Sequence, residues 1–530
     1  MRRFNVFSVV LLLFSLACGL STLAEPLSLQ LRSRVPYTSD MNIGGFCAYE
    51  GFNDADYLFR YQTTEWEPSE TALIICDMWN GHHCLDAVHR VEELVPQMNE
   101  VVKAAREKGV LIVHSPSDCM GAYRDTPARR RAIESKEKGT AAGLRAPASR
   151  WNRRAEGEPR QPIDDSDGGC DKSCRSEPTN PPWWTAQHPG LDIDQEKDII
   201  SDNDEIYYVF QERKIRNILF MGVHANMCVQ GRPFGIRNLV KSGYNVVLVR
   251  DLTDSMYNPK KAPFVSHVRG TELVVGHIER YHCPTIVSSD LIGGKAFRFR
   301  EDTRKKVVFL VSDDHYHADK TLPMLAEYLM DRYDFYCVVI HGEGRGKYRH
   351  FDELDDCNAF VIYQRRSEIP QVLAEKFLNL VKNPNQGCLG MRTASHGFET
   401  RTDASPGWRT FSVREMAELF GGNYANHGPD AAGSDVENVL NDKTHALLEG
   451  IEPAEWHSVG SQYYTLPLAE DSLLLQNSNE NGRVEPLTWI RPSTESRARL
   501  AFTCLGHPAD FNHPAGLSMI VRLIRWSAGE

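Results

Sequence analysis

The sequence lacks several features that would assign it to a specialised class of protein. It contains no internal repeat and no coiled-coil heptads, which excludes solenoids and long coiled coils. It also has no excess of positive charge, because 60 Lys and Arg stand against 71 Asp and Glu, for a net charge of −11. Since binding to nucleic acid requires a basic face, nucleic acid is not an expected partner.

Long hydrophobic runs are scarce. The run from Val9 to Leu16 follows Arg2 and Arg3, and small residues precede a cleavage position after Ala24. This pattern is typical of a secretory signal peptide. The run is short for a membrane anchor and no second one follows. We therefore expect an exported chain, periplasmic or secreted, without a membrane span after cleavage.

Paired cysteine motifs with metal-ligand spacing are missing too. Of the 13 cysteines, 12 follow the predicted cleavage position, and Cys170 and Cys174 lie close together in a loop rich in Gly, Asp and Ser. In an oxidising compartment these two form the best candidate disulfide. Their spacing would also allow a metal site, but no second pair completes it. The sequence predicts neither a cofactor nor a bound metal.

The 530 residues are too many for one ordinary core. Short buried-type runs alternate with helical patterns at 72–76, 110–113, 218–221, 246–249 and 285–287, and again at 307–311, 336–340, 359–363 and 500–503. This alternation is typical of parallel sheets that helices cover on both faces. The predicted fold class is α/β, with two three-layer α/β/α domains and mainly parallel sheets.

The predicted domain boundaries follow changes in composition. The signal peptide covers 1–24 and an N-terminal extension covers 25–64. The first domain covers 65–292 and carries a long polar insertion at about 120–195, and long loops in compact domains are often functional. A charged stretch without periodicity at 293–304 is the expected linker, and the second domain covers 305–530.

Three residues of the first domain could form a catalytic group. Asp77 ends the strand at 72–76, and Cys228 follows the strand at 218–221 and leads into a predicted helix, whose dipole would lower the pKa of the thiol. The carboxyl ends of parallel strands meet at one edge, so Asp77 could take the thiol proton, and Lys197 could steady the charge. Each residue also has an ordinary alternative: a strand-end acid, a buried thiol and a solvated lysine.

Two segments carry a family resemblance. Ala72-Leu73-Ile74-Ile75-Cys76-Asp77-Met78 and Gly222-Val223-His224-Ala225-Asn226-Met227-Cys228-Val229 resemble the signature strands of the isochorismatase-like, or nicotinamidase-related, cysteine hydrolases, and 241–251 matches the family's next strand. The resemblance covers about 65–290. It implies that the family's Asp, Lys and Cys fall on Asp77, Lys197 and Cys228, and that a small carboxamide is hydrolysed through a Cys thioester.

The same resemblance implies further features of the site. A non-proline cis peptide would fall near Val223-His224, and backbone N–H groups near Ala225 and Cys228 would hold the oxyanion. The Asp-x-His pattern of the nicotinamidase metal site is absent, so no zinc is expected. His114 is a candidate substrate contact or, equally, a hydrogen-bonded histidine at a strand end. The Trp183-Trp184 pair either caps the pocket or, as we favour, anchors the insertion.

The second domain resembles a different family. The segments at 387–398 and 505–511 resemble the trehalose-utilisation (ThuA-like) family, which has a flavodoxin-like fold akin to class I glutamine amidotransferases, and the resemblance covers about 305–526. Arg392 stands where those enzymes carry a nucleophilic Cys, so glutaminase activity is not expected. Arg392, His396, His507 and Arg365 could converge on a sugar-like or anionic ligand. The alternative is a polar domain edge without chemistry.

The sequence thus predicts an exported cysteine-dependent hydrolase of the amidase type with an accessory ligand-binding domain. Its expected partner is a small-molecule amide, and a homo-oligomer is compatible with the sequence. The main alternative is a carbohydrate-processing or sugar-binding protein whose principal site lies in the second domain. A third alternative is a secreted binding protein without catalysis. The presence of Asp77, Lys197 and Cys228 together favours the hydrolase over that third alternative.

Overall fold

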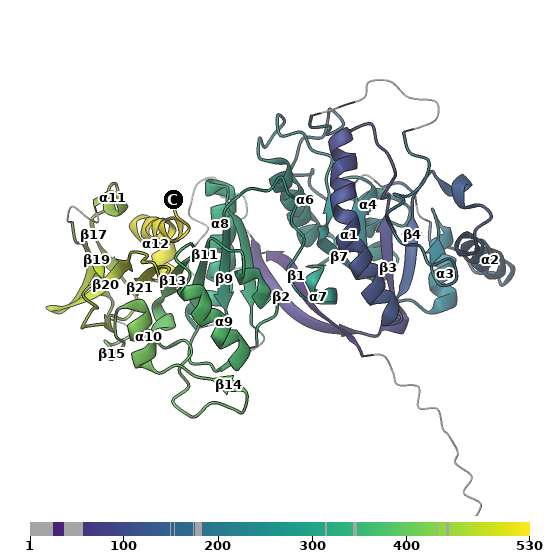
Figure 1. Ribbon diagram of the computed structural model, residues 1–530. Coiled ribbons are helices and arrows are strands. Elements are labelled where there is room, and N and C mark those ends of the chain that lie inside the picture. Colours follow the sequence, from purple (N-terminus) through teal and green to yellow (C-terminus); the bar gives the residue numbers. More distant parts are fainter. Residues whose placement is uncertain are drawn as a thin grey trace, which may run out of the picture.

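The computed structural model describes residues 25–36, 57–148, 150–152, 154–172, 174, 183–312, 315–342, 347–430, 432–440 and 445–530. The chain forms two α/β halves, each built on one mixed sheet that contains parallel strands (Figure 1). Among the described residues, no helix is both long and apolar enough to cross a membrane. The predicted signal peptide at 1–24 lies outside the described residues.

The first sheet has eight strands in the order β2-β1-β8-β7-β6-β3-β4-β5. Their bounds are β1 Leu27–Pro36, β2 Tyr57–Trp66, β3 Thr71–Cys76, β4 Leu111–Ser115, β5 Ile199–Ile200, β6 Asn217–Val223, β7 Asn245–Asp254 and β8 Thr285–Ile286. The strands from β8 to β5 are parallel, whereas β1 and β2 form an antiparallel ribbon at the edge. The predicted strands of this half are confirmed.

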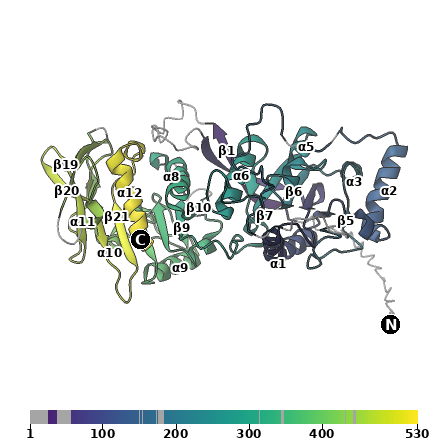
Figure 2. The ribbon, with the colours of Figure 1, turned by 90° about the horizontal axis from the view of Figure 1, so that it is seen from above.

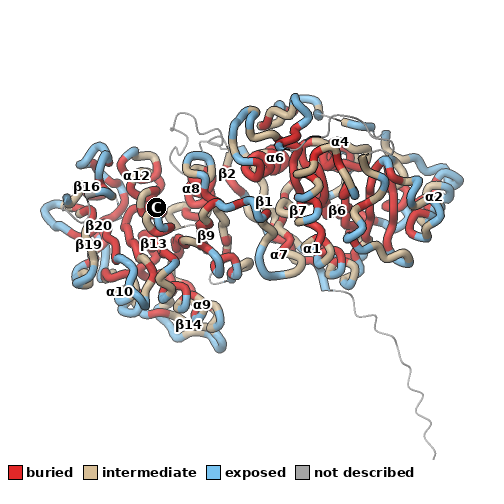
Figure 3. The backbone as a smooth tube through the Cα atoms, turned by 45° about the horizontal axis from the view of Figure 1, so that its top comes forward, coloured by how far each residue is buried: buried red, intermediate tan, exposed pale blue. Residues whose placement is uncertain are grey.

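Strand β3 illustrates why this half folds in three layers. All six of its residues are buried, because both faces of the sheet are covered. Ile74 packs into the core beneath α3 (Glu205–Arg213), α5 (Ile236–Lys241) and α6 (His267–Tyr281), whereas the next residue, Ile75, packs beneath α1 (Leu85–Glu107). The alternation follows from the two-residue period of a strand. Figure 3 shows the buried backbone concentrated in the sheets.

The second sheet has nine strands in the order β10-β9-β11-β13-β21-β20-β19-β16-β17. Its parallel part comprises β9 Lys306–Val311, β10 Tyr336–His341, β11 Ala359–Tyr363, β13 Gly387–Met391 and β21 Arg499–Thr503. All of these strands except β13 were predicted. The remaining strands are antiparallel: β16 Ser434–Asn438, β17 Glu455–Ser458, β19 Leu473–Glu480 and β20 Arg483–Arg491. The expectation of a mainly parallel second sheet is therefore wrong for this side of the sheet.

The other elements of the second half flank that sheet or its loops. The longer helices are α8 Ala318–Tyr333, α9 Gln371–Val381, α10 Val413–Phe420 and α12 Pro514–Ser527. The short elements are α11 His445–Leu448 and two small ribbons, β12 Ile369–Pro370 with β14 Trp408–Arg409 and β15 Asn426–His427 with β18 Tyr463–Tyr464.

The β1–β2 ribbon lies between the halves (Figure 1). Leu29 of β1 packs into a core of the first half, whereas Phe59 of β2 belongs to the core of the second. Arg34 bridges the halves as well, because its Nε lies 3.1 Å from Glu279 of α6 and its Nη2 lies 2.8 Å from Glu327 of α8. Segments predicted as an N-terminal extension thus complete both halves.

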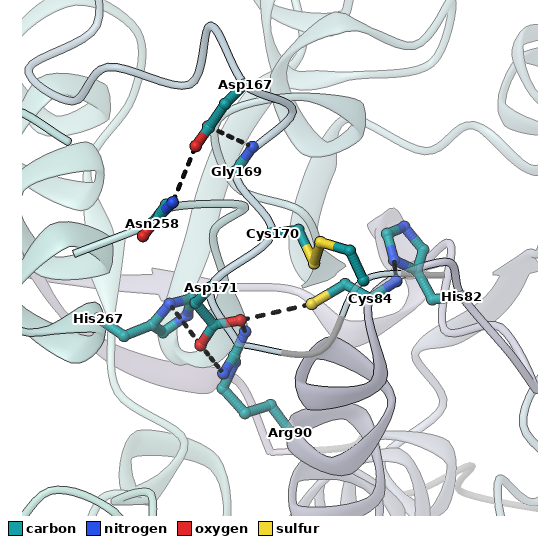
Figure 4. The surroundings of a disulfide bond; sticks show 10 residues. His82, Cys84, Arg90, Asp167, Gly169, Cys170, Asp171, Asn258 and His267 are labelled. Atoms are coloured by element: carbon teal, nitrogen blue, oxygen red, sulfur yellow. Dashed lines mark hydrogen bonds and ion pairs between the residues drawn. A yellow bond between two sulfur atoms is a disulfide. The ribbon is translucent and has the colours of Figure 1, made fainter. Parts of the chain in front are cut away.

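The insertion of the first half is structured in part. It contains α2 (Pro127–Ala141), which packs against α3. The predicted Cys170–Cys174 disulfide is confirmed, with the two Cα atoms 6.1 Å apart (Figure 4). The short helices α4 (Cys228–Gly231) and α7 (Ser289–Ile292) complete this half. After α7, the predicted linker is packed against the first half, since Phe299 is buried in its core.

Candidate active site

Asp77 lies at the carboxyl end of β3 and is fully buried. Its backbone has a left-handed φ of 49°, and its Oδ1 accepts a hydrogen bond from the Ser117 N–H at 2.8 Å. Its Oδ2 lies 2.9 Å from the Nε of Arg232. Burial raises the pKa of Asp77, while the Arg232 charge and the hydrogen bonds oppose that shift. Asp77 is thus a carboxyl group placed to exchange a proton.

Cys228 follows β6 as the first residue of α4, and its thiol lies beside the Asp77 carboxylate. The thiol is unpaired and its residue is 8% exposed. The peptide between Val223 and His224 is cis, as the resemblance implied. Close approach of β6 to β3 depends on Gly222, because a Cβ there would lie 2.1 Å from the Cys76 carbonyl oxygen. The predicted pairing of Asp77 with Cys228 is therefore present in the fold.

The expected lowering of the Cys228 pKa is wrong. Burial raises the pKa of the thiol well above its usual value, and the negative charge of Asp77 adds to the shift. The helix that begins at Cys228 has four residues, so its dipole is short. Cys228 therefore rests as a thiol, and attack on a substrate requires transfer of its proton to Asp77.

Lys197 is not part of this site. Its side chain is 71% exposed and lies 3.6 Å from Asp194 at the surface. The cation beside Asp77 is Arg232, which follows Cys228 by four residues. The Arg232 side chain is 14% exposed. Arg232 also contacts Asp118 at 3.1 Å. The signal for Arg232 was present in Cys228-Val229-Gln230-Gly231-Arg232, because that spacing returns a side chain to the same helix face.

Two predicted substrate contacts are engaged elsewhere. The Ala225 N–H donates to the Asp254 carbonyl oxygen at 2.6 Å, so it does not point to a free oxyanion position. His114 is fully buried, with Nδ1 3.1 Å from Gln187 and Nε2 3.3 Å from Asp198. His114 is therefore the hydrogen-bonded strand-end histidine of the alternative interpretation. Within the described part of the chain, the Cys228 N–H has no hydrogen-bond partner.

A small pocket adjoins the Asp77 carboxyl group. Its cavity volume is about 10 Å³, and it is lined by Asp77, Trp79, Gly81, His82, Ala87, Val88, Val91, Val223 and His224. Burial lowers the pKa of His82 to about 2 and the pKa of His224 to about 4, so both imidazoles are neutral near pH 7. Trp184 of the insertion stacks on Trp79 at 4.3 Å between ring centroids. It anchors the insertion behind the pocket wall.

A buried ion-pair network, which no sequence pattern indicated, supports the pocket from behind. Arg90 contacts Asp171 at 2.9 Å (Figure 4). Arg90 also contacts Asp254 at 2.8 Å, and His267 contacts Asp254 at 2.8 Å. Burial alone would raise the pKa of Asp254, but the charges of Arg90 and His267 hold it below its usual range. The same Asp171 follows Cys170, so the network ties the disulfide loop to α1.

Two clusters of the described residues have the composition of a metal site. In one, Glu158 lies within reach of His277 and His282, and in the other, Cys84 and Asp86 lie within reach of Asp171. The carboxylates of Glu158 and Asp171 are already held by arginines. Glu158 receives two hydrogen bonds from Arg237, and Asp171 receives two from Arg90. The arginine contacts of Glu158 and Asp171 attach the insertion to α5 and α1.

In the second half, Arg392 is enclosed by protein groups. It is 1% exposed, its φ is 43°, and it donates to the Cys504 carbonyl oxygen at 2.8 Å and to the Ser461 hydroxyl at 3.0 Å. Its guanidinium also lies over the rings of Tyr316 and Tyr463. The expectation that the Arg392 guanidinium is free to bind a ligand is therefore wrong.

The other predicted residues of the second half fall into two places. His507 begins the turn at 508–511 and shares a capping box with Asp510, and its ring is 5.9 Å from that of Tyr316. His396 lies against Tyr424, with ring centroids 4.2 Å apart. Burial and the charges of Arg366 and Arg365 lower the pKa of His396 to about 3. Arg365 and His396 are thus neighbours, whereas His507 lies beside Arg392.

Comparisons with known proteins give distant likenesses. No family model matches the chain, and no curated protein does. The structural neighbours include a protein from Bacteroides uniformis described as ThuA-like, with 15% identity, a TM-score of 0.33 and coverage of 44% of this chain and 95% of that chain. They also include a cysteine hydrolase from Pseudomonas syringae pv. phaseolicola, with 16% identity, a TM-score of 0.27 and coverage of 42% and 92%. A third is an isochorismatase-family protein from Burkholderia thailandensis, with 13% identity, a TM-score of 0.25 and coverage of 42% and 94%.

Proposed function

We propose that this protein is a cysteine hydrolase that cleaves the C–N bond of a small carboxamide. The observation that carries the proposal is the contact of the Cys228 thiol with the buried Asp77 carboxylate, which is held in turn by Arg232 and the Ser117 N–H. A nucleophile within hydrogen-bond reach of a base that a third group orients is the arrangement of covalent catalysis.

The first half-reaction uses Asp77 twice. As the sulfur of Cys228 attacks the amide carbonyl carbon, its proton passes to Asp77, and the carbonyl oxygen becomes an oxyanion. The Cys228 N–H is the backbone donor that would stabilise this charge. The protonated Asp77 then gives its proton to the amide nitrogen, the C–N bond breaks, and ammonia or an amine leaves behind a thioester.

The second half-reaction returns the enzyme to its starting state. Asp77 takes a proton from a water molecule, and the water oxygen attacks the thioester carbon. The C–S bond then breaks, the carboxylic acid leaves, and the proton held by Asp77 returns to the Cys228 sulfur. Arg232 stays charged throughout and holds the Oδ2 of Asp77. Burial raises the pKa of Asp77, which makes it a stronger base than a solvated carboxylate.

The pocket limits the substrate class. It offers the neutral imidazoles of His82 and His224 and no charged side chain other than Asp77. Because a buried carboxylate disfavours a second negative charge nearby, we infer that the substrate is uncharged around its amide group. At about 10 Å³ the cavity has room for roughly one water molecule, so entry of an acyl group requires the pocket to widen. An accessory ligand-binding role for the second half, and export through residues 1–24, are part of the same proposal.

A carboxamide library screened for ammonia release tests the proposal. Wild type should release ammonia from at least one small amide, and Cys228→Ala should not. Asp77→Asn should reduce turnover by about 100-fold or more, because general-base catalysis contributes about that much. Asp118→Asn is the matched control, since Asp118 contacts the same Arg232 but is 60% exposed. Equal turnover by Asp77→Asn and wild type would contradict the mechanism.

A further inference from the structure

A second cavity lies between the two halves, remote in sequence from Cys228. Its volume is about 150 Å³, and its walls come from the β1–β2 ribbon, β7, α6, the segment after α7 and β10. Figure 2 shows α8 and β10 of the second half facing α6 and β7 of the first. A cavity of about this size lined by apolar groups can hold a benzene-sized molecule.

Much of the wall is apolar. Val268 and Val275 of α6, Phe297 of the segment after α7, and Val338 of β10 contribute hydrocarbon surface from three sides. Such walls suit a ligand with a compact hydrocarbon body and exclude one that is polar all round.

The polar part of the wall is dominated by arginines, and Arg250 differs from the rest. The others pair with acids: Arg32 and Arg34 with Glu279, Arg269 with Glu327, Arg298 with Asp302, and Arg304 with Glu272. Arg250 of β7 donates to the Thr285 hydroxyl at 3.3 Å, and among the described residues no carboxylate lies within ion-pair distance of it. Arg250 is half-buried, and an enclosed cation without a paired acid is a favourable place for an anion.

The neighbouring acids bond to other groups and do not form an ion pair with Arg250. The Glu279 carboxylate is divided between Arg32 and Arg34. Asp251, the next residue of β7, accepts hydrogen bonds from the Ser288 N–H, the Ser288 hydroxyl and the Phe297 N–H. Burial and the charge of Arg32 lower the pKa of Arg250, and the nearby charges of Glu279 and Asp251 offset only part of that shift.

We propose that this cavity binds a small organic carboxylate, with the carboxylate on the Arg250 guanidinium and a ring-sized hydrocarbon body between the valine and phenylalanine walls. A planar guanidinium can hold a carboxylate through two parallel hydrogen bonds. Because both halves line the cavity, the bound carboxylate stabilises their association. The proposal is independent of the hydrolase reaction at Cys228.

Benzoate is the probe, and binding to the full-length protein is measured by calorimetry and by thermal shift. Benzoate should bind and raise the melting temperature. Acetate and inorganic phosphate, which lack the ring, and benzyl alcohol, which lacks the charge, should each bind at least about tenfold more weakly. Equal binding of phosphate or benzyl alcohol would overturn the proposed ligand class, and no binding of benzoate at millimolar concentration would overturn the site.

Variants locate the binding. Arg250→Met should weaken benzoate binding by about tenfold or more, whereas Arg60→Met, an exposed arginine of the same ribbon, should not change it. Cys228→Ser should bind benzoate like wild type, and loss of binding in that variant would place benzoate at the active site and overturn the proposal. Arg250→Met should melt no lower than wild type without ligand, because it removes an uncompensated cation. If Arg250→Met fails to fold, Arg250→Lys decides: weaker benzoate binding than wild type supports the site, and equal binding overturns it.

Discussion

At the scale of single residues, the chemistry depends on how Arg232 holds Asp77. The guanidinium lies 2.9 Å from the carboxylate and is mostly shielded from water. Its charge opposes the effect of burial on the pKa of Asp77. Arg232 therefore stabilises the charged form of Asp77, and in the proposed mechanism it also sets the pH above which Asp77 can accept a proton.

This predicts a shift of the pH profile in an Arg232 variant. Without the positive charge, the pKa of Asp77 rises further, so Asp77 loses its basic form at a higher pH. The acid limb of kcat/KM in Arg232→Met should therefore move upward by about 1–3 pH units, and Arg232→Lys should restore part of the shift. The profile is measured with any amide found in the screen.

Lys197→Met supplies the matched control. Lys197 is exposed and pairs with Asp194, so its removal should leave both turnover and the acid limb unchanged. If Lys197→Met shifts the limb and Arg232→Met does not, the assignment of Arg232 is wrong.

The site residues that could be predicted from the sequence are those that directly follow a predicted strand. Asp77 and Cys228 each follow an apolar run, and parallel strands bring such positions together. The prediction failed for Lys197, because a lysine beside a long insertion has no periodic neighbour to fix its place. Ala225 was misassigned, and the choice between the two interpretations of His114 stayed open, because their partners, Asp254 and Asp198, come from distant segments.

At the scale of elements, α1, β7 and α6 are joined by a buried network of charges. Arg90 comes from α1, Asp254 from the end of β7 and His267 from the first turn of α6. The pKa of Asp254 is held below its usual range and the pKa of His267 is raised above its usual value. The two charged forms therefore support each other in the folded state.

Asp254→Asn should lower the free energy of unfolding by about 3–5 kcal/mol, because it leaves Arg90 and His267 without their shared acid. The contribution of Asp254 is present above about pH 4 and is lost as the pH falls through its lowered pKa. The contribution of His267 is present below about pH 6.5 and is lost as the pH rises through its raised pKa. The difference from wild type should thus be largest between those values.

Urea unfolding at several pH values measures this difference. Asp435→Asn is the control, since that carboxylate is 81% exposed and pairs with a surface histidine. A difference that stays constant from pH 3 to pH 9 would show that the charges of this network do not matter for folding.

The elements themselves were predictable to different degrees. Most of the parallel strands were found because they are short apolar runs between helices, as in β11, where every residue is buried. The two-residue β5 and the glycine-containing β13 were not predicted. The antiparallel side of the second sheet was missed because its strands are polar on one face, and β16 reads Ser-Asp-Val-Glu-Asn with two exposed acids. The β1–β2 ribbon was missed for the same reason, since arginines alternate with its apolar residues.

At the scale of the whole molecule, the two halves share one ribbon. Phe59 of β2 is 8% exposed and belongs to the core of the second half, although its strand is hydrogen-bonded to the first sheet. Arg34 of β1 adds ion pairs to both α6 and α8. The halves are therefore not joined by the chain at 293–304 alone.

Phe59→Ala should lower the stability of the second half by about 3 kcal/mol, because it opens a cavity beneath α8. The unfolding transition of that half should move to lower urea concentration and separate from that of the first half. Phe264→Ala is the control, since Phe264 is 73% exposed and should change stability by less than about 0.5 kcal/mol. Coincident transitions in Phe59→Ala and wild type would contradict a shared ribbon.

The position of this ribbon also bears on how the chain folds as it is synthesised. Phe59 leaves the ribosome 266 residues before Leu325 of α8, a member of the same core. At about 5–20 residues per second, that interval lasts roughly 10–50 s. During it, the first half can form its own sheet while the outer side of β2 remains uncovered. The nascent chain therefore carries an exposed apolar strand until α8 emerges, and this strand is where a chaperone would bind.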